Sequence, residues 1–329
     1  MLHALAAIAL VAALGSAEAQ QRARVLDSFD TVAPYDAVLS DGVSATITQV
    51  DGQEGAAARF AYNFNGGAGY ASMRRALPLR FPENYEVSFL IRGEGPANTL
   101  EFKLADQSGE NVWWRVQRNF TPTSEWQRVT IRKRHIEFAW GPTEDRALRQ
   151  SAFLEFVISA GSGGQGAIEV DQLTIRELPP VPATFPSIRG RATSGADIAA
   201  ALDNNLDTAW RSDAAGAQSV TFDLGLAREF GGVVLRWAPE GHAVRYALES
   251  SLDGEEWRTL GETTQGDGSV DPWMLPESEA RYIRLRLQET NASAYGLAEF
   301  QLRDLAFGAT PTAFFQALAR EAPRGAYPR

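Results

Sequence analysis

The stretch ALDNNLDTAWRSD, residues 201–213, decides the fold of the second half of this chain. It places oxygen-bearing side chains close together, at Asp203, Asn205, Asp207 and Thr208. Carboxylate, amide and hydroxyl oxygens are hard ligands, which suit a calcium-type cation better than zinc or copper. The stretch therefore predicts a structural metal site, and the alternative interpretation is an ordinary polar turn.

Strand patterns follow this loop. Apolar residues alternate with polar ones in short segments, as in a strand that buries one face. The segments SVTFDLG and RYIRLRLQE would bury Val220, Phe222 and Leu224, and Ile283, Leu285 and Leu287. The Asp-Gly pair in VRYALESSLDGEEWRTL predicts a hairpin turn. Before the loop, Ser194 and Asp197 have the spacing of a capping box, which predicts a short helix to about Leu202.

A set of motifs occurs in one order along this half: DNNLDTAW, FDLG, a hydrophobic strand ending at Trp237, SLDGEEW, RYIRLRL and YGLAEFQL. This order resembles the discoidin family, also called the coagulation-factor C-type domain, which includes the family 32 carbohydrate-binding modules. The resemblance implies a galactose-binding-like β-sandwich over residues 187–308. It also implies that Trp210 and Trp257 are buried.

The same resemblance implies a ligand set for the metal. In the family, the loop that matches residues 203–208 binds a structural calcium together with a Glu of the closing strand. Carried over to this chain, the metal residues are Asp203, Asn205 through its backbone carbonyl, Thr208 and Glu299, with Asp207 in a supporting place. Asn204 stands where the family usually has Gly, and Asn tolerates the left-handed backbone that Gly would supply.

Sugar ligands in this family lie against variable loops at one end of the sandwich. Residues of this chain at such positions combine stacking rings with charged hydrogen-bond donors. The candidates are Arg211, His242, Arg245, Trp273 in the loop DPWMLP, and Tyr295. His242 and Trp273 lead this set.

The first half, residues 22–178, also alternates apolar and polar residues, which predicts an antiparallel β-sandwich. In TLEFKLADQSGENVWWRVQ the pattern predicts a hairpin whose core face carries Leu100, Phe102 and Leu104, then Val112, Trp114 and Val116. Trp113, Arg115 and Gln117 would then point outward, where a ring and polar groups can grip a sugar. The alternative is that Trp113 packs under a loop or against the second domain. Trp140 and His135 are ligand candidates of second rank.

The opening and closing strands of this half, LDSFD at residues 26–30 and AIEVDQLTI at residues 167–175, resemble those of galactose-binding-like jelly rolls. Many carbohydrate-binding modules have this sandwich. In that family the first loop and an Asp of the final strand often share a calcium ion, which implies Asp27, Asp30 and Asp171 as ligands. The predicted fold class is therefore all-β, with two jelly-roll β-sandwich domains in tandem and a short C-terminal helix.

Three further segments mark the ends and the middle of the chain. Residues 4–14 form an apolar run too short to span a bilayer, and Ala17-Glu18-Ala19 follows, so residues 1–19 are interpreted as a secretory signal, with a buried element as the alternative. Four prolines in LPPVPATFP predict an extended linker at residues 179–186. Thr310-Pro311 predicts the start of a helix in the tail, residues 309–329.

This layout resembles the non-catalytic N-terminal part of larger secreted bacterial glycoside-hydrolase-like proteins. The resemblance implies that the tail begins a further domain and that a catalytic domain lies downstream of Arg329. Together with the signal, it predicts a secreted or periplasmic protein with no membrane span.

Composition narrows the function. The chain has 329 residues, no cysteine and a net charge of −10, which excludes disulfides and thiolate chemistry and argues against a nucleic-acid partner. It has three histidines and no GxSxG, HExxH or phosphate-loop motif. We predict a carbohydrate-binding protein, or the targeting modules of a polysaccharide-acting enzyme, with structural calcium. The alternative is an adhesion or assembly module that binds protein or cell envelope, and a glycosidase that uses paired carboxylates ranks third.

Overall fold

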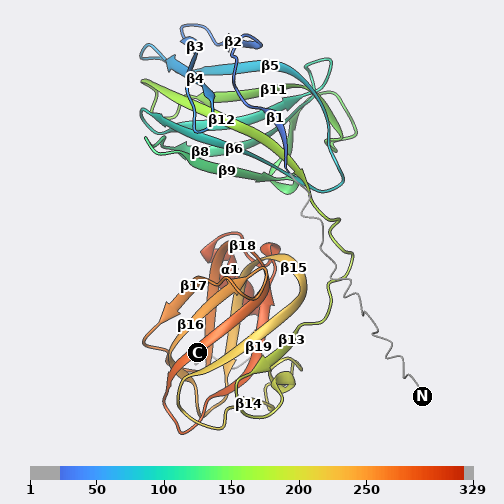
Figure 1. Ribbon diagram of the computed structural model, residues 1–329, viewed down its shortest axis with the longest axis vertical. Coiled ribbons are helices and arrows are strands. Elements are labelled where there is room, and N and C mark those ends of the chain that lie inside the picture. Colours follow the sequence, from blue (N-terminus) through green and yellow to red (C-terminus); the bar gives the residue numbers. More distant parts are fainter. Residues whose placement is uncertain (1–22, 322–329) are drawn as a thin grey trace, which may run out of the picture. The chain divides into compact units, whose positions relative to one another are not determined.

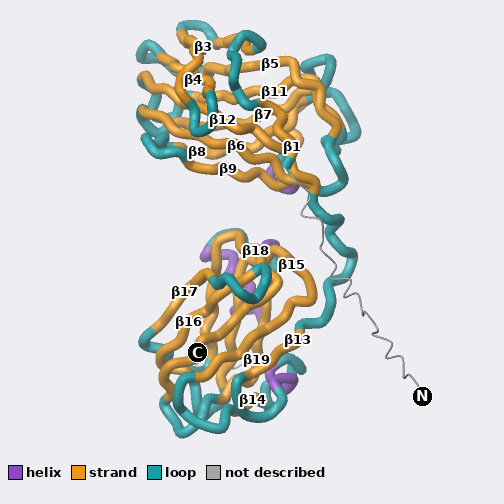
Figure 2. The backbone as a smooth tube through the Cα atoms, viewed as in Figure 1, coloured by secondary structure: helices purple, strands orange, loops and turns teal. Residues whose placement is uncertain are grey.

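The computed structural model describes residues 23–321. The chain divides into two compact units, Met1–Val181 and Pro182–Arg329, here named unit 1 and unit 2. The interpreted signal at residues 1–19 and the tail beyond residue 321 lie outside the described residues. Figures 1 and 2 show that strands dominate both units, and each unit is considered by itself.

Unit 1 is a sandwich of two antiparallel sheets (Figure 1). Sheet A has the strand order β3 (Ser44–Asp51), β4 (Ala56–Asn63), β12 (Gln165–Glu177), β6 (Tyr85–Glu94) and β9 (Gln127–Arg132), and β1 (Arg24–Asp27) pairs with β12. Sheet B has the order β10 (Glu137–Trp140), β8 (Val112–Phe120), β7 (Asn98–Ala105), β11 (Gln150–Ser159), β5 (Tyr70–Arg80) and β2 (Tyr35–Leu39). The short 3-10 helix η1 (Lys133–His135) joins β9 to β10.

The core of unit 1 lies between these sheets. Phe89 on β6 stacks on Phe102 on β7 with ring centroids 6.0 Å apart, and it meets Phe156 on β11 edge-on at 5.0 Å. All three side chains are buried. Because each buried ring of this size contributes about 1.5–3 kcal/mol, this contact holds the two sheets together.

The predicted inward face of β8 is wrong. Leu104 on β7 lies opposite Trp113, and Lys103 lies opposite Trp114. Residues directly opposite each other in an antiparallel pair project from the same face, so Trp113 lies on the core side and Trp114 on the outer side. By the same register Arg115 and Gln117 lie on the core side of β8, and Val116 lies on the outer side.

The loop between β7 and β8 sets this register. The backbone N–H of Asp106 donates to the carbonyl of Asn111 at 3.1 Å, which places Ala105 opposite Val112. A shift by one residue would exchange the two faces of β8.

Unit 2 is built from one seven-stranded antiparallel sheet that bends into two layers. Its order is β14 (Trp210–Arg211), β19 (Gly296–Arg303), β15 (Gln218–Trp237), β18 (Val270–Thr290), β16 (Ala243–Ser251) and β17 (Arg258–Thr263), and β13 (Arg189–Ala192) pairs with β15. The strands β15, with 20 residues, and β18, with 21, run through both layers. Their pairing shifts register between Asp223 and Arg228, where Gly225 has a φ of +81°.

The core of unit 2 lies between its layers. Phe222 in the first part of β15 stacks on Phe300 of β19 with centroids 3.7 Å apart. The residues predicted to face inward are buried: Val220, Phe222, Leu224, Ile283, Leu285 and Leu287. Trp210 is also buried as predicted, but Trp257 is not a core residue, because its half-buried ring lies under the guanidinium of Arg284 at 3.9 Å.

Short helices flank these strands. The predicted helix before the oxygen-rich loop is the 3-10 helix η2 (Ile198–Ala201), and its cap is Asp197, which accepts the N–H of Ala199 at 3.0 Å. Ser194 does not cap it, since its hydroxyl donates to Gln218 at 2.7 Å.

In the tail, helix α1 (Pro311–Glu321) begins at the predicted position. Its Phe314 is buried against Phe307 of the 3-10 helix η3 (Leu305–Phe307), with centroids 5.2 Å apart. Within residues 23–321, no helix is long and apolar enough to cross a membrane.

Candidate functional site

The oxygen-rich loop of unit 2 lies between η2 and β14. The hydroxyl of Thr208 is 2.8 Å from Asp203 Oδ2 and 2.8 Å from the backbone carbonyl of Asn205. The N–H of Asn205 donates to Asp203 Oδ1 at 2.9 Å. Asn204 has a φ of 57°, which is the left-handed conformation predicted for this position. The loop therefore gathers its oxygens around Asp203.

Glu299 of β19 completes this group. Its side chain is only 2% exposed, and Oε2 has no hydrogen-bond partner. Burial raises the pKa of Glu299, the charge of Asp203 raises it further, and the N–H of Asn204 opposes these effects. A buried carboxylate oxygen without a partner is costly, which makes Glu299 Oε2 the most exacting atom of this group.

The residues present fit a calcium ion. Hard oxygens are available from two carboxylates, a backbone carbonyl and a hydroxyl, in the set Asp203, Asn205, Thr208 and Glu299. Asp207 is exposed, and only its N–H bonds within the loop, to Asn205 Oδ1 at 3.1 Å. The described residues hold no group of three or more Asp, Glu, His or Cys side chains suited to a metal, so a cation at this loop would depend on the neutral oxygens of Asn205 and Thr208 as well.

The structure does not gather the metal residues predicted in unit 1. Asp27 accepts hydrogen bonds from the hydroxyl of Tyr35 at 2.7 Å and from the guanidinium of Arg75. Asp30 accepts the N–H of Ala56 at 3.3 Å, and Asp171 is fully buried. Protein donors thus bond to all three carboxylates, and calcium binding by Asp27, Asp30 and Asp171 stays a prediction.

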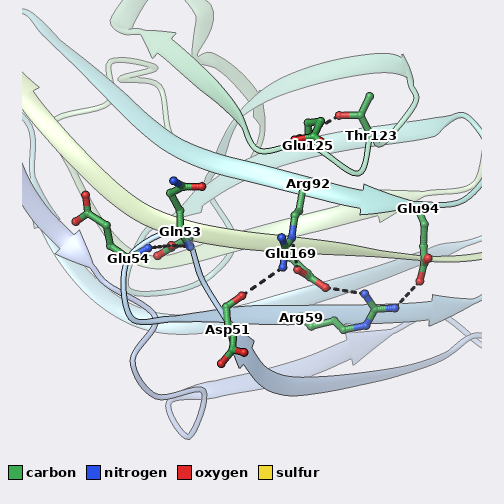
Figure 3. A network of polar contacts seen from close by, with 10 residues as sticks. Asp51, Gln53, Glu54, Arg59, Arg92, Glu94, Thr123, Glu125 and Glu169 are labelled. Carbon is green, nitrogen blue, oxygen red and sulfur yellow. Dashed lines mark hydrogen bonds and ion pairs between the residues drawn. The ribbon is translucent and has the colours of Figure 1, made fainter.

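Both carboxylate oxygens of Asp171 accept hydrogen bonds from the backbone. Its Oδ2 accepts the backbone N–H groups of Gln53 at 2.8 Å and Glu54 at 3.3 Å, and its Oδ1 accepts that of Gln172 at 2.7 Å. Figure 3 shows Gln53 and Glu54 in the loop that it anchors. Asp171 therefore fastens the turn between β3 and β4.

Unit 2 has a cavity of about 420 Å³ near the oxygen-rich loop. Its lining combines polar and apolar groups from several loops, including Leu206, Arg236, Trp237, His242, Asp267 and Asn291. Of the residues predicted to contact a sugar in this unit, His242 lines the cavity. Leu206 belongs to the loop that carries Asp203, so the cavity and the candidate metal centre share a wall.

The other sugar candidates of unit 2 lie elsewhere. Trp273 is not in a loop but within β18, where its indole N–H donates to the hydroxyl of Tyr246 at 2.9 Å. Tyr295 is fully buried and cannot touch a ligand. Arg211 and Arg245 are exposed, outside the lining of the cavity. Full burial therefore makes the prediction wrong for Tyr295, whereas Trp273 is partly buried against the core and its ligand role stays a prediction.

In unit 1, Trp113 is 6% exposed, and its indole N–H donates to the carbonyl of Arg146 at 2.7 Å. It packs under the loop before β11, as in the alternative interpretation. Arg115 donates to Gln117 at 2.7 Å, and both share the inward side of β8. His135 accepts the N–H of Arg132 at 3.1 Å, which gives it a structural role.

An open patch of rings lies instead on the outer side of sheet B, and we name it the aromatic face: Tyr70, Lys103, Trp114 and Trp140. Trp140 is 47% exposed and meets Trp114 edge-on, with centroids 5.2 Å apart. Tyr70 is 39% exposed. The Lys103 ammonium lies 5.4 Å from the Trp140 centroid, 5.6 Å from that of Trp114 and 5.7 Å from that of Tyr70.

The sequence prediction included Trp140 and missed the rest of this face. The position of Lys103 in the sequence could have indicated which face of the hairpin is outward. It lies between the core residues Phe102 and Leu104, so it has to point outward, together with whichever Trp shares its side.

Charged groups beside the aromatic face are paired. Lys103 Nζ is 2.8 Å from Glu101 Oε2, and the hydroxyl of Ser159 donates to Glu101 Oε1 at 2.6 Å. Farther along the sheet, Arg74 lies 3.6 Å from Glu155. The face therefore offers rings, ion-paired donors and carboxylate acceptors on one surface.

The outer side of sheet A is different (Figure 3). Glu169 forms ion pairs with Arg59 at 2.7 Å and with Arg92 at 2.6 Å. Arg59 also forms an ion pair with Glu94 at 2.6 Å. The guanidinium of Arg92 covers the ring of Trp126 at 4.5 Å. Burial favours a higher pKa for Glu169, but the hydrogen bonds from Arg92 and Arg59 outweigh it and hold the pKa below its usual value.

Comparison with known proteins supports part of this description. The sequence profile of the F5/8 type C domain matches residues 185–300, which confirms the predicted resemblance of the second half to the discoidin family. No curated protein matches the chain.

Several solved structures are similar to parts of the chain. Chitosan-binding module 2 of a chitosanase/glucanase from Paenibacillus sp. IK-5, in complex with chitotriose, is 27% identical, covering 36% of this chain and 96% of that one with a TM-score of 0.34. The family 32 module of Clostridium perfringens NanJ, in complex with galactose, is 19% identical, with 35% and 93% covered and a TM-score of 0.33. The family 11 module of the Clostridium thermocellum cellulase Lic26A-Cel5E is 17% identical, with 48% and 96% covered and a TM-score of 0.40.

Proposed function

We propose that this protein binds carbohydrate and that the aromatic face of unit 1 is one of its binding sites. The observation that carries this proposal is the pair of exposed rings, Trp140 from β10 and Tyr70 from β5, on either side of Lys103 from β7. Aromatic rings stack on the apolar faces of pyranose rings, and nearby polar groups bond the hydroxyls. An open sheet face suits an oligosaccharide rather than a small enclosed ligand.

A second carbohydrate site in unit 2 is part of this proposal. Support comes from the F5/8 type C match and from the cavity of about 420 Å³, which sets Trp237 beside His242, Asp267 and Asn291. Trp237 is only 5% exposed and its indole N–H donates to Asp271 at 2.7 Å, so the polar groups of the cavity rather than this ring would contact the sugar.

We also propose a structural calcium ion in the loop of unit 2. Asp203, Asn205, Thr208 and Glu299 would hold it. The ion would supply positive charge to two carboxylates that are close to each other and would satisfy Glu299 Oε2. These residues would then fix the loop that carries Leu206 to the cavity.

The binding role is proposed to be non-catalytic. Glu101 is ion-paired with Lys103, and Glu155 with Arg74, so neither carboxylate of the aromatic face is poised as a free acid or nucleophile. The apolar run at residues 4–14 supports export to the periplasm or the medium. The resemblance of the layout to secreted glycoside-hydrolase-like proteins supports a catalytic domain downstream of Arg329.

The test is a glycan array with the wild-type chain, Trp140→Ala and Phe315→Ala. Phe315 is 49% exposed on α1 and serves as a matched control, an exposed ring outside the face. Loss of one stacking ring should weaken binding about tenfold, or about 1.4 kcal/mol. Calorimetry measures the affinities. No glycan bound by the wild type, or equal affinity of all three proteins, contradicts the proposal.

An adhesion or assembly role is the second candidate. It is favoured by two exposed leucines at turns of unit 2, Leu206 at 49% and Leu252 at 59%. Single surface leucines are common, however, and protein or membrane sites usually show contiguous apolar patches. We therefore place this role after carbohydrate binding.

A further inference from the structure

The aromatic face already contains a cation. Three rings surround the ammonium of Lys103 at centroid distances between 5.4 and 5.7 Å, within the range of cation–π attraction. A cage of this kind would bind an ammonium group of a ligand if its centre were free. Here a side chain of the protein occupies the centre, and it is only 14% exposed.

The carboxylates next to the cage are also paired with groups of the protein. Glu101 is 7% exposed, its Oε2 is ion-paired with Lys103, and its Oε1 accepts the hydroxyl of Ser159. Glu155 bonds to Ser72 at 2.7 Å and pairs with Arg74. A charged ligand would have to break one of these pairs or remain unpaired beside them, and separating a buried pair is strongly unfavourable. Neutral hydroxyl groups can bond to the same atoms without breaking a pair.

The rim of the face adds a negative bias. Asp36 lies opposite Arg74 in the ladder between β2 and β5, and Glu137 lies opposite Trp114 in the ladder between β8 and β10. Both are therefore on the outer side of sheet B, and both are exposed. Their charges repel an approaching carboxylate but attract an ammonium, so the rejection of amino sugars depends on the filled cage alone.

We propose that the aromatic face selects neutral glycans and rejects both uronates and amino sugars, because the cage around Lys103 is filled and its charges are paired. This specificity rests on the proposed carbohydrate-binding function. Lys103 acts as the selector: it occupies the place of a ligand ammonium and neutralises Glu101. Removing its charge should open the cage and leave Glu101 to attract a cation.

The first experiment compares oligosaccharides that share one backbone. Calorimetry with the full chain would use cellohexaose, the corresponding hexamer of glucuronate units and the hexamer of glucosamine, below the pKa of its amines. We expect cellohexaose to bind at least about tenfold more tightly than either charged hexamer. Equal or tighter binding of a charged hexamer, or no binding of any hexamer, overturns the proposal. Either result leaves the array test of carbohydrate binding as a separate question.

The second experiment changes the selector. Lys103→Met keeps the apolar stem and removes the ammonium, and Lys133→Met is the matched control, since Lys133 lies on η1 and donates to the carbonyl of Glu83. Lys103→Met should shift the preference between cellohexaose and the glucosamine hexamer about tenfold toward the latter. Lys133→Met should leave it unchanged. An unchanged preference in Lys103→Met overturns the proposal.

A double variant guards against a folding artefact. Lys103→Met combined with Glu101→Gln removes both charges of the pair, so it should gain no affinity for the glucosamine hexamer relative to the wild type. A gain in the double variant equal to that in Lys103→Met would show that Glu101 does not attract the amine, which overturns the mechanism. Thermal melting of each variant checks that the fold persists.

Discussion

Glu169 in unit 1 and Glu299 in unit 2 are both buried glutamates on strands, yet their surroundings are opposite. Both oxygens of Glu169 accept hydrogen bonds from arginines, whereas Glu299 Oε2 has no partner. Accordingly the pKa of Glu169 is lowered and that of Glu299 is raised. The paired charge of Glu169 stabilises the scaffold, and the unpaired Oε2 of Glu299 is the atom that the proposed calcium ion would satisfy.

The largest effect that would separate these two glutamates is metal removal. If calcium completes the site of Glu299, a concentration 100-fold above its Kd stabilises unit 2 by about 2.7 kcal/mol, which corresponds to a rise of about 5–11 °C in melting temperature. Calorimetry with calcium and after chelation measures this shift. Hydrogen exchange of residues 201–213 should report the same loss of order.

Two variants control this prediction. Asp203→Asn and Glu299→Gln should each abolish the calcium-dependent rise, whereas Asp30→Asn in unit 1 should preserve it. Identical melting curves with calcium and with chelator would refute the site and remove the contrast between the two glutamates.

The second-largest expected effect is the loss of stability when the paired glutamate, Glu169, is replaced. Glu169→Gln leaves Arg59 and Arg92 facing a neutral amide and should lower the free energy of unfolding of unit 1 by about 2 kcal/mol, less than a fully buried pair because both arginines are about one-third exposed. Urea denaturation measures the change. Addition of calcium should not restore the loss, and glycan binding by the aromatic face should persist. A variant as stable as the wild type would show that this network is dispensable.

The smallest expected effect is the pH dependence of the stability that Glu169→Gln loses. Because the folded pKa of Glu169 lies below its unfolded value, its stabilisation is complete above the ordinary carboxyl pKa of about 4.3 and disappears as pH falls through the lowered folded value. The stability gap between wild type and Glu169→Gln should therefore be constant from pH 7 to pH 5 and close toward pH 3. Urea titrations at these pH values measure it. A gap that widens in acid would reverse the assigned sign.

The sequence predicts the cores of both units well, because strand periodicity and burial are local properties. It also predicts the oxygen-rich loop, where Asp203, Asn205 and Thr208 are neighbours in the chain. Glu299 was found only through the family resemblance, since the residues between it and the loop form most of unit 2.

The sequence does not predict which face of β8 is inward. In VWWRV both faces carry a Trp, so hydrophobicity does not distinguish them, and the register depends on the hydrogen bond between Asp106 and Asn111. Likewise Asp27 has the sequence context of a metal ligand, but the structure brings Arg75 and Tyr35 to it from other strands. Partners distant in sequence decide both cases.

The two long strands of unit 2 have a consequence for how the unit unfolds. Because β15 and β18 each run through both layers, two continuous strands connect the layers of unit 2. In unit 1 the two layers are separate sheets joined by loops. We expect unit 2 to open as a single cooperative block, in which amides in both halves of β15 share one free energy of opening.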